Sequence, residues 1–395
     1  MKKYLFILGL VGTALFTACS SVDDLTEEKP NEASSVDKAK EATLILEAGQ
    51  DSDVPIALGM LGSRRYAMTR LPLESTEFQI SGGNLSVYCL ATGIQAGSPN
   101  ISAIPASADD IVWNDPNKIA NWLVNKPAIV SYYNGTGASP IPGVSGPYSY
   151  IQFWKDGNVK ERFYPFGNWY SYDFFAYYPR VGDANTSYSD TGKSCFANIT
   201  IDGSKDVIWG HASGSDEGFS AKYMRLNPTT VPEFVFNHLL TQLVFYVRPH
   251  DDVAAAEFSG SGIKVTDLYL KDVDTKFNLC VASMSSDHTS GELELPAEDD
   301  RVLGNIKVYT TGTNNDAFAG GATYPVATSS TDTDRKIIGY AMVPPIAASE
   351  HYTVQIVVKD GIENDYYNYY YTVNPPSEGF LAGKKYNIEL DIKKK

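Results

Sequence analysis

The clearest indication of the fold class of this chain is the run Tyr172-Asp173-Phe174-Phe175-Ala176-Tyr177-Tyr178-Pro179. Most of its side chains are aromatic, which is too apolar for a solvated edge, so we expect a strand that is largely buried. Runs of β-branched and aromatic residues, separated by clusters of Gly, Asn, Asp and Pro, recur along the chain, whereas long helical patterns are scarce. These patterns predict an all-β protein built from β-sandwiches.

Strand-like segments lie on both sides of a break at Asn227-Pro228-Thr229-Thr230-Val231-Pro232. Residues 49–75 show no regular periodicity and are interpreted as a loop. The break predicts two β-sandwich domains in tandem, residues 41–232 and 233–395, each of ordinary domain size. The principal strands that we predict are 42–48, 78–80, 85–88, 163–165, 172–178, 196–201, 206–209, 234–247, 265–270, 302–309, 336–343, 352–358, 366–373 and 383–392.

The N-terminal residues have the pattern that is typical of an export signal. Lys2 and Lys3 precede the apolar run Leu5 to Phe16, which is too short to span a bilayer, and Phe16-Thr17-Ala18-Cys19 closes it with small residues before a thiol. We predict a signal peptide at 1–18 and lipidation of Cys19, which anchors the protein to a membrane. The alternative is an ordinary signal peptide with a chance cysteine at its end, because Thr17-Ala18 also fits a simple cleavage site.

Residues 19–40 form the predicted tether. They are polar and acidic, with few large apolar side chains, so we expect a lipidated, disordered segment. An acidic stretch directly after the lipidated cysteine resembles the surface-export signal of some Gram-negative lipoproteins, which implies the outer membrane as the location. A plain solvated linker is the alternative interpretation.

The charge of the chain argues against some classes of partner, and the spacing of its cysteines argues against a metal site. The net charge of −15 leaves no basic patch for phosphates, which argues against nucleic acid as a partner and against binding of anionic lipid by charge. Cys89, Cys195 and Cys280 lack metal-site spacing. We interpret them as small core residues, with one disulfide among the three left open.

No sequence motif points to catalysis. The five histidines show no metal-ligand spacing, and neither a Gly-x-Ser-x-Gly elbow nor a complete phosphate-binding loop occurs around Thr191-Gly192-Lys193-Ser194. We therefore predict no metal, no cofactor and no enzymatic activity.

Four segments resemble the fimbrillin family, the type V pilins of Gram-negative anaerobes. They are the aromatic run at 172–179, Asp206-Val207-Ile208-Trp209-Gly210, Phe234-x-Phe236-x-His238-Leu239-Leu240-x-x-Leu243-x-Phe245, and Gly383-Lys384-Lys385-Tyr386-Asn387-Ile388-x-Leu390. With Cys19 they extend from one end of the chain to the other. The resemblance implies two transthyretin-like β-sandwich domains on a lipidated precursor.

The resemblance also implies maturation by an arginine-specific protease that removes the leader and the first strand. In this chain that strand is 42–48, with Ala42, Thr43, Leu44, Ile45 and Leu46 as its removed residues. Its loss leaves unpaired backbone groups and apolar side chains, a template for β-strand addition by another pilin subunit. Arg70 is the preferred cleavage site and Arg65 the second, because both lie in the patternless stretch where proteases cut.

The expected role is a structural and adhesive subunit of a cell-surface fimbrium, anchored first in the outer membrane and then extracellular. Shaft subunits of the family carry donor strands after the Gly-Lys-Lys-Tyr segment, whereas this sequence stops at Lys395, so the resemblance implies a tip-like subunit over shaft or anchor. A host or bacterial surface receptor is the expected partner of such a tip. The alternative is a monomeric surface lipoprotein that binds glycan or a host ligand through aromatic loops.

Overall fold

The computed structural model describes residues 50–60, 80–95, 98, 104–141, 143–167, 169–212, 218–261, 263–309, 324–325, 336–362 and 365–393. Within these ranges the protein is all-β, as the aromatic and alternating runs predicted. The helices that the structure describes are short: α2 (Ala221–Leu226), α3 (Asp252–Ser261), and the 3-10 turns η1 (Ala108–Asp110), η2 (Asp183–Asn185) and η3 (Glu298–Asp300). None of the described helices is long and apolar enough to cross a membrane.

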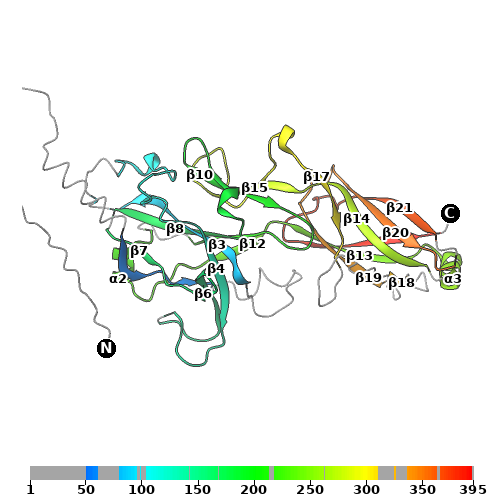
Figure 1. Ribbon diagram of the computed structural model, residues 1–395, viewed down its shortest axis with the longest axis horizontal. Helices are drawn as coiled ribbons and strands as arrows, with labels where there is room; N and C mark the ends of the chain where they lie inside the picture. The colour runs from blue at the N-terminus through cyan, green and yellow to red at the C-terminus, as the bar shows by residue number, and fades with distance from the viewer. Residues whose placement is uncertain are drawn as a thin grey trace, which may run out of the picture. The chain divides into compact units, whose positions relative to one another are not determined.

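The aromatic run forms the centre of an eight-stranded antiparallel sheet (Figure 1). It lies in β8, where Tyr172, Phe174, Phe175 and Tyr177 are all buried, which confirms the prediction made for this run. The order across the sheet is β12 (Val235–His238), β11 (Ile208–Ala212), β8 (Tyr170–Tyr178), β3 (Ile80–Ile94), β4 (Leu123–Tyr133), β5 (Tyr148–Lys155) and β2 (Leu58–Gly59), with β6 (Asn158–Val159) paired to β5.

A four-stranded sheet uses strands from both sides of residue 232. Its order is β16 (Leu293–Glu294), β15 (Lys276–Ser283), β10 (Ser194–Thr200) and β9 (Thr186–Tyr188). The pairing of β10 with β15 joins residues that lie on opposite sides of the predicted domain boundary. The division of the chain into tandem domains at 232/233 therefore stays a prediction.

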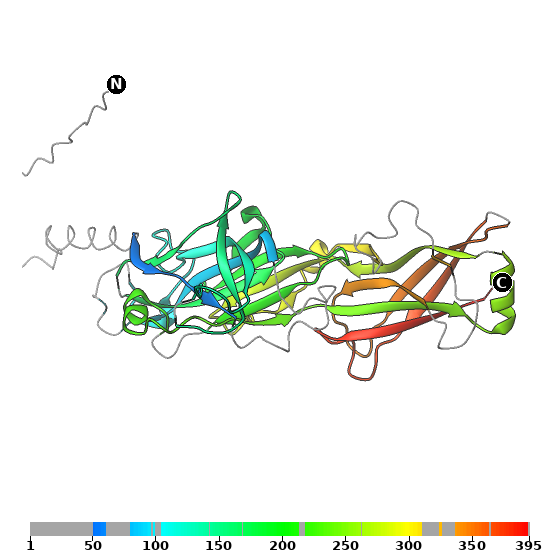
Figure 2. The same ribbon diagram turned by 90° about the horizontal axis from the view of Figure 1, so that it is seen from below.

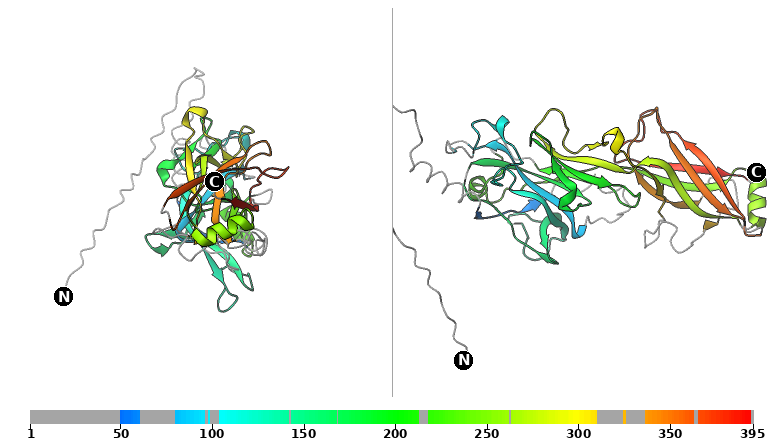
Figure 3. Two further views of the ribbon diagram at one scale, coloured as in Figure 1. Left: turned by 90° about the vertical axis from the view of Figure 1, so that its right-hand side faces the viewer. Right: turned by 45° about the horizontal axis from the view of Figure 1, so that its top comes forward.

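Two more sheets are built mainly from the second half of the chain. One has the order β19 (Lys336–Val343), β13 (Thr241–Pro249) and β22 (Lys385–Ile392), and its β13–β22 pair is parallel (Figure 2). The other has the order β17 (Leu303–Lys307), β14 (Lys264–Asp274), β20 (Tyr352–Lys359) and β21 (Tyr366–Val373), with β18 (Tyr324–Pro325) on β14. α3 follows β13 and lies beside the end of β22, where the His250 N–H donates to the Ile392 carbonyl (Figure 3).

One predicted strand was too long. The run 234–247 is interrupted at Leu239 and Leu240, so that β12 belongs to the eight-stranded sheet and β13 to another. Thr241, buried at the start of β13, donates its hydroxyl to the Leu381 carbonyl. The continuous apolar pattern arises because both halves are buried, and periodicity alone does not reveal a change of sheet.

The three internal cysteines are buried free thiols, as predicted for small core residues, and none forms a disulfide. Burial raises the pKa of the Cys89 and Cys195 thiols above their usual range and that of Cys280 to about 12. These thiols are therefore inert packing groups.

Candidate functional site

The residues that the sequence predicts for processing lie outside the described residues. This holds for Cys19, for the first strand with Ala42, Thr43, Leu44, Ile45 and Leu46, and for both Arg65 and Arg70. Their roles stay predictions. What the structure does describe is the segment directly between the predicted first strand and the predicted cleavage sites, residues 50–60.

Segment 50–60 is bound to the rest of the fold through its backbone. Its first part is β1 (Asp51–Pro55), which pairs antiparallel with β7 (Phe163–Pro165). The Phe166 N–H donates to the Gln50 carbonyl at 2.7 Å, and the Ile56 N–H donates to the Arg162 carbonyl at 2.7 Å. This part therefore supplies an extra strand beside β7.

The last residues of segment 50–60 form one end of the eight-stranded sheet and also bond to residues beside the strand at its other end. β2 is the last strand in the order of that sheet and pairs with β5, and the Met60 N–H donates to the Ser149 carbonyl at 3.1 Å. On its other side Gly59 forms a parallel bridge with Glu233, next to the start of β12 at the opposite edge. Its N–H donates to the Pro232 carbonyl and its carbonyl accepts from the Phe234 N–H, both at 2.9 Å. Removal of this segment leaves backbone groups unpaired on both sides of the gap.

The same segment buries an alternating set of apolar side chains. Ile56, Leu58 and Met60 are 9%, 1% and 2% exposed and belong to the hydrophobic core. Alternate side chains of an extended segment point to one face, so all three enter the same side of the gap. Burial of each contributes about 1.5–3 kcal/mol. The gap that segment 50–60 fills is thus an apolar groove with paired backbone on both walls, hereafter the strand groove.

A surface ion pair attaches the other end of the segment. Arg225, on α2, donates to the Asp53 carboxylate, and this hydrogen bond lowers the pKa of Asp53. Asp53 is exposed, so we expect solvent to screen the pair. The backbone bonds and the three apolar side chains therefore dominate the binding of the segment.

The sequence does not predict this segment, because residues 49–75 show no regular period and are typical of a loop. The signal was present but short: Ile56-Ala57-Leu58-Gly59-Met60 alternates large and small side chains over five residues. A strand of two residues such as β2 lies below the length at which alternation is distinguishable from chance.

No protein-family model matches the chain, and neither does any curated protein. A crystal structure of a candidate cell adhesion protein from Bacteroides fragilis is similar over 87% of this chain and 93% of its own, at 11% identity and a TM-score of 0.37. One from Bacteroides eggerthii is similar over 79% and 88%, at 9% identity and a TM-score of 0.33. A fimbrial protein from Bacteroides ovatus covers 87% of this chain but 49% of its own, at 11% identity and a TM-score of 0.24. Similarities this distant do not establish a shared function.

Proposed function

We propose that this chain is a structural and adhesive subunit of a cell-surface pilus of the fimbrillin type, assembled by protease-triggered strand exchange. One observation carries the proposal. Segment 50–60 fills a groove with backbone bonds and three buried apolar side chains, and it precedes Arg65 and Arg70 in the sequence. A cut at either arginine severs this segment, together with the predicted first strand, from the body of the protein.

The free energy of apolar burial in the strand groove is large enough to favour binding of another subunit's strand after cleavage. Ile56, Leu58 and Met60 together contribute about 5–9 kcal/mol of apolar burial, which an emptied groove regains by accepting another subunit's strand. Before the cut, the covalent link keeps the local concentration of the segment high, so an incoming strand cannot compete. Cleavage by an arginine-specific protease removes that advantage and leaves a template for β-strand addition.

The location and role that we propose follow from the resemblance of the sequence to the fimbrillin family. We infer a precursor held at the outer membrane through Cys19 and a mature form in the extracellular fimbrium. The tip-like position and a host or bacterial surface receptor rest on that resemblance alone. The names of the compared structures, cell adhesion and fimbrial proteins, are of the same kind as this proposal, which does not depend on them. It assigns no catalytic role to the chain.

The N-terminus of the mature protein tests the proposal. Protein sheared from the cell surface is expected to begin at Leu71 or Tyr66, as read by Edman sequencing and intact mass. The alternative, a monomeric surface lipoprotein that binds glycan or a host ligand, keeps Cys19 at its N-terminus. A sheared protein that still carries acylated Cys19 would overturn the pilin proposal and favour this alternative.

Cys19→Ala is expected to abolish acylation and release the precursor from membranes. The acyl chains are the predicted anchor, since each buried methylene contributes about 0.8 kcal/mol and the net charge of −15 opposes binding to anionic lipid. Membrane fractionation with metabolic labelling by a fatty acid measures both effects. Cys280→Ala, which changes a buried thiol, is the matched control and should leave fractionation unchanged. Tight membrane binding of the Cys19→Ala protein would contradict the lipid anchor.

A further inference from the structure

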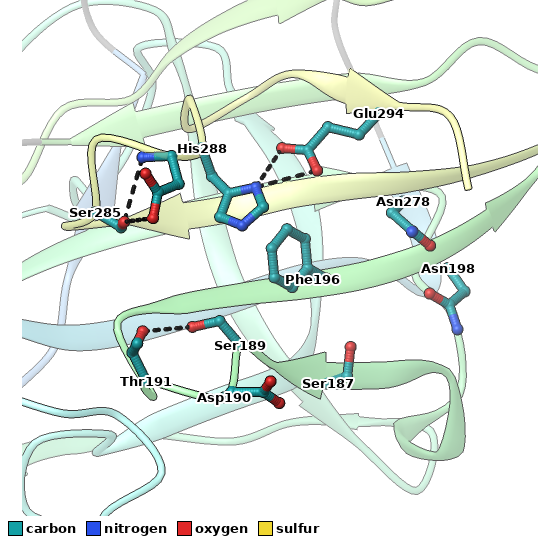
Figure 4. Close-up of a pocket in the computed structure, with 11 residues that line it drawn as sticks. Ser187, Ser189, Asp190, Thr191, Phe196, Asn198, Asn278, Ser285, His288 and Glu294 are labelled. Carbon is teal, nitrogen blue, oxygen red and sulfur yellow. Dashed lines mark hydrogen bonds and ion pairs between the residues drawn. The ribbon is translucent and has the colours of Figure 1, made fainter. Parts of the chain in front are cut away.

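We propose that a polar pocket on the outer face of the four-stranded sheet binds a neutral carbohydrate. The pocket has a volume of about 520 Å³, within the range of about 300–1,000 Å³ for small-ligand sites. It lies over β9, β10, β15 and β16 (Figure 4), and no residue of segment 50–60 lines it. This inference rests on the proposed adhesive function, for which it names the class of ligand.

The floor of the pocket carries one aromatic ring among polar side chains. On β10 the buried residues Cys195, Ala197 and Ile199 alternate with Phe196 and Asn198 on the opposite, outer face. Phe196 is only partly buried there, and the His288 ring packs against it at 4.8 Å and 79°. A partly exposed aromatic ring in a polar concavity offers an apolar surface for the C–H face of a sugar ring.

Hydrogen-bonding groups lie next to this ring in a fixed row. The strand register places Asn198 opposite Asn278, and Asn278 opposite Glu294 (Figure 4). The side-chain amides of Asn198 and Asn278 form no hydrogen bond with any residue that the structure describes, so their donors and acceptors are free for a ligand. Sugar hydroxyl groups both donate and accept, as do these amides, which matches a carbohydrate better than a purely anionic or cationic ligand.

The rim of the pocket is fixed before any ligand arrives. The turn at 189–193 and the turn at 284–291 are joined by the Met284 N–H, which donates to the Lys193 carbonyl at 2.9 Å, and by the hydroxyls of Ser194 and Ser283 at 2.9 Å. The first turn is also anchored by the Trp113 N–H, which donates to the Gly192 carbonyl at 2.7 Å. A preformed rim reduces the ordering cost of binding.

The charge of the pocket selects against acidic sugars. Asp190, Asp287 and Glu294 supply carboxylates, and Glu294 is engaged by His288 Nδ1 at 2.9 Å. These carboxylates repel sialylated or sulfated ligands. Among the described residues, no group of three or more His, Cys, Asp or Glu side chains is placed to hold a metal ion. The ligand class is therefore a neutral glycan bound without a cation.

The test is binding of the purified full-length precursor to an array of neutral oligosaccharides ending in galactose, glucose, mannose, fucose or N-acetylhexosamine, each printed beside sialylated or sulfated counterparts. At least one neutral glycan is expected to bind, and its acidic counterpart to bind about tenfold more weakly or less. With that glycan in calorimetry, Phe196→Ala is expected to weaken binding about tenfold. Asn198→Ala, at an exposed position that does not risk the fold, should weaken it about three- to tenfold.

Tyr370→Ala is the matched control, because Tyr370 is also an outward aromatic side chain on a strand but lies on β21, outside the pocket. The Tyr370→Ala protein should bind the glycan with the same affinity as the parent protein. The inference is overturned if no neutral glycan binds with a Kd below ~10 mM, if Phe196→Ala and Asn198→Ala bind as the parent does, or if binding requires added Ca²⁺. Because the assay uses the uncleaved precursor, its failure leaves strand exchange untouched, and failure of cleavage leaves glycan binding measurable.

Discussion

Cleavage of the purified precursor after Arg65 or Arg70 is expected to create a binding site for a synthetic peptide of residues 50–60. Limited trypsin digestion makes the cut, and Edman sequencing identifies the products that begin at Tyr66 or Leu71. Once severed, the native segment is no longer covalently tethered and exchanges with free peptide. The uncut precursor should not bind, since its groove holds Ile56, Leu58 and Met60 already.

Fluorescence anisotropy of a labelled peptide measures this exchange. The matched control is the same peptide with Ile56, Leu58 and Met60 replaced by serine, which keeps every backbone donor and acceptor but removes the apolar burial. We expect at least about a hundredfold weaker binding for the serine peptide. Equal binding of the two peptides would show that the strand groove does not select its occupant, and binding to the uncut precursor would show that cleavage is not the trigger.

A second readout separates an emptied groove from general unfolding. The aromatic strand β8 and the eight-stranded sheet retain most of their pairings when segment 50–60 leaves, because only the β2 and β1 pairings are lost. The cut protein is therefore expected to keep its strand circular dichroism while it binds a hydrophobic dye, and addition of peptide 50–60 should reverse the dye binding. Loss of the strand signal on cleavage would mean that the segment is part of the folded body and not an exchangeable strand.

The strands that the sequence predicts correctly are those with long, regular patterns of side chains. The aromatic run became β8, and 336–343 and 366–373 match β19 and β21 from end to end. Each of these carries about eight residues of aromatic, β-branched or alternating side chains, which is enough to indicate a strand. The all-β class follows from many such segments, so an error in any one of them does not change it.

The sequence pattern does not predict which strands pair when they lie far apart in the chain. β10 and β15 lie about eighty residues apart in the chain, and a register shift separates Cys195 from Phe196 in their ladder. Local pattern shows that each segment is apolar on one face, but it carries no information about which partner covers that face. The pocket beside Phe196 depends on this pairing, and for that reason the sequence alone gave no sign of it.

The strand groove was missed for a different reason. Its filler is eleven residues long, contains a proline at Pro55, and forms only short strands. The proposed exchange needs a segment that can leave after cleavage, and short strands with few pairings leave more easily than long ones. Strands this short also give too little alternation for periodicity to identify them.

Replacement of Arg64, Arg65 and Arg70 by alanine is expected to abolish pilus assembly while leaving the precursor folded and lipidated. Without a cut, segment 50–60 stays covalently linked to the groove that it fills, and its high local concentration excludes a donor strand. Electron microscopy of the cell surface and the mass of the sheared fraction measure assembly, and membrane fractionation reports the retained anchor. Binding of glycan to the proposed pocket should be unchanged, because no residue of segment 50–60 lines it.

The matched variant replaces the same three arginines by lysine, which preserves charge and size closely. An arginine-specific protease should leave this variant uncut in cells, so that it fails to assemble just as the alanine variant does. Trypsin, which also accepts lysine, should cut it in vitro and restore binding of peptide 50–60. This pair of results separates the loss of a cleavage site from any structural effect of lost arginine charge. Fibres on cells that carry the alanine variant, at parental density, would reject the mechanism, because a chain that assembles uncut does not need its groove emptied.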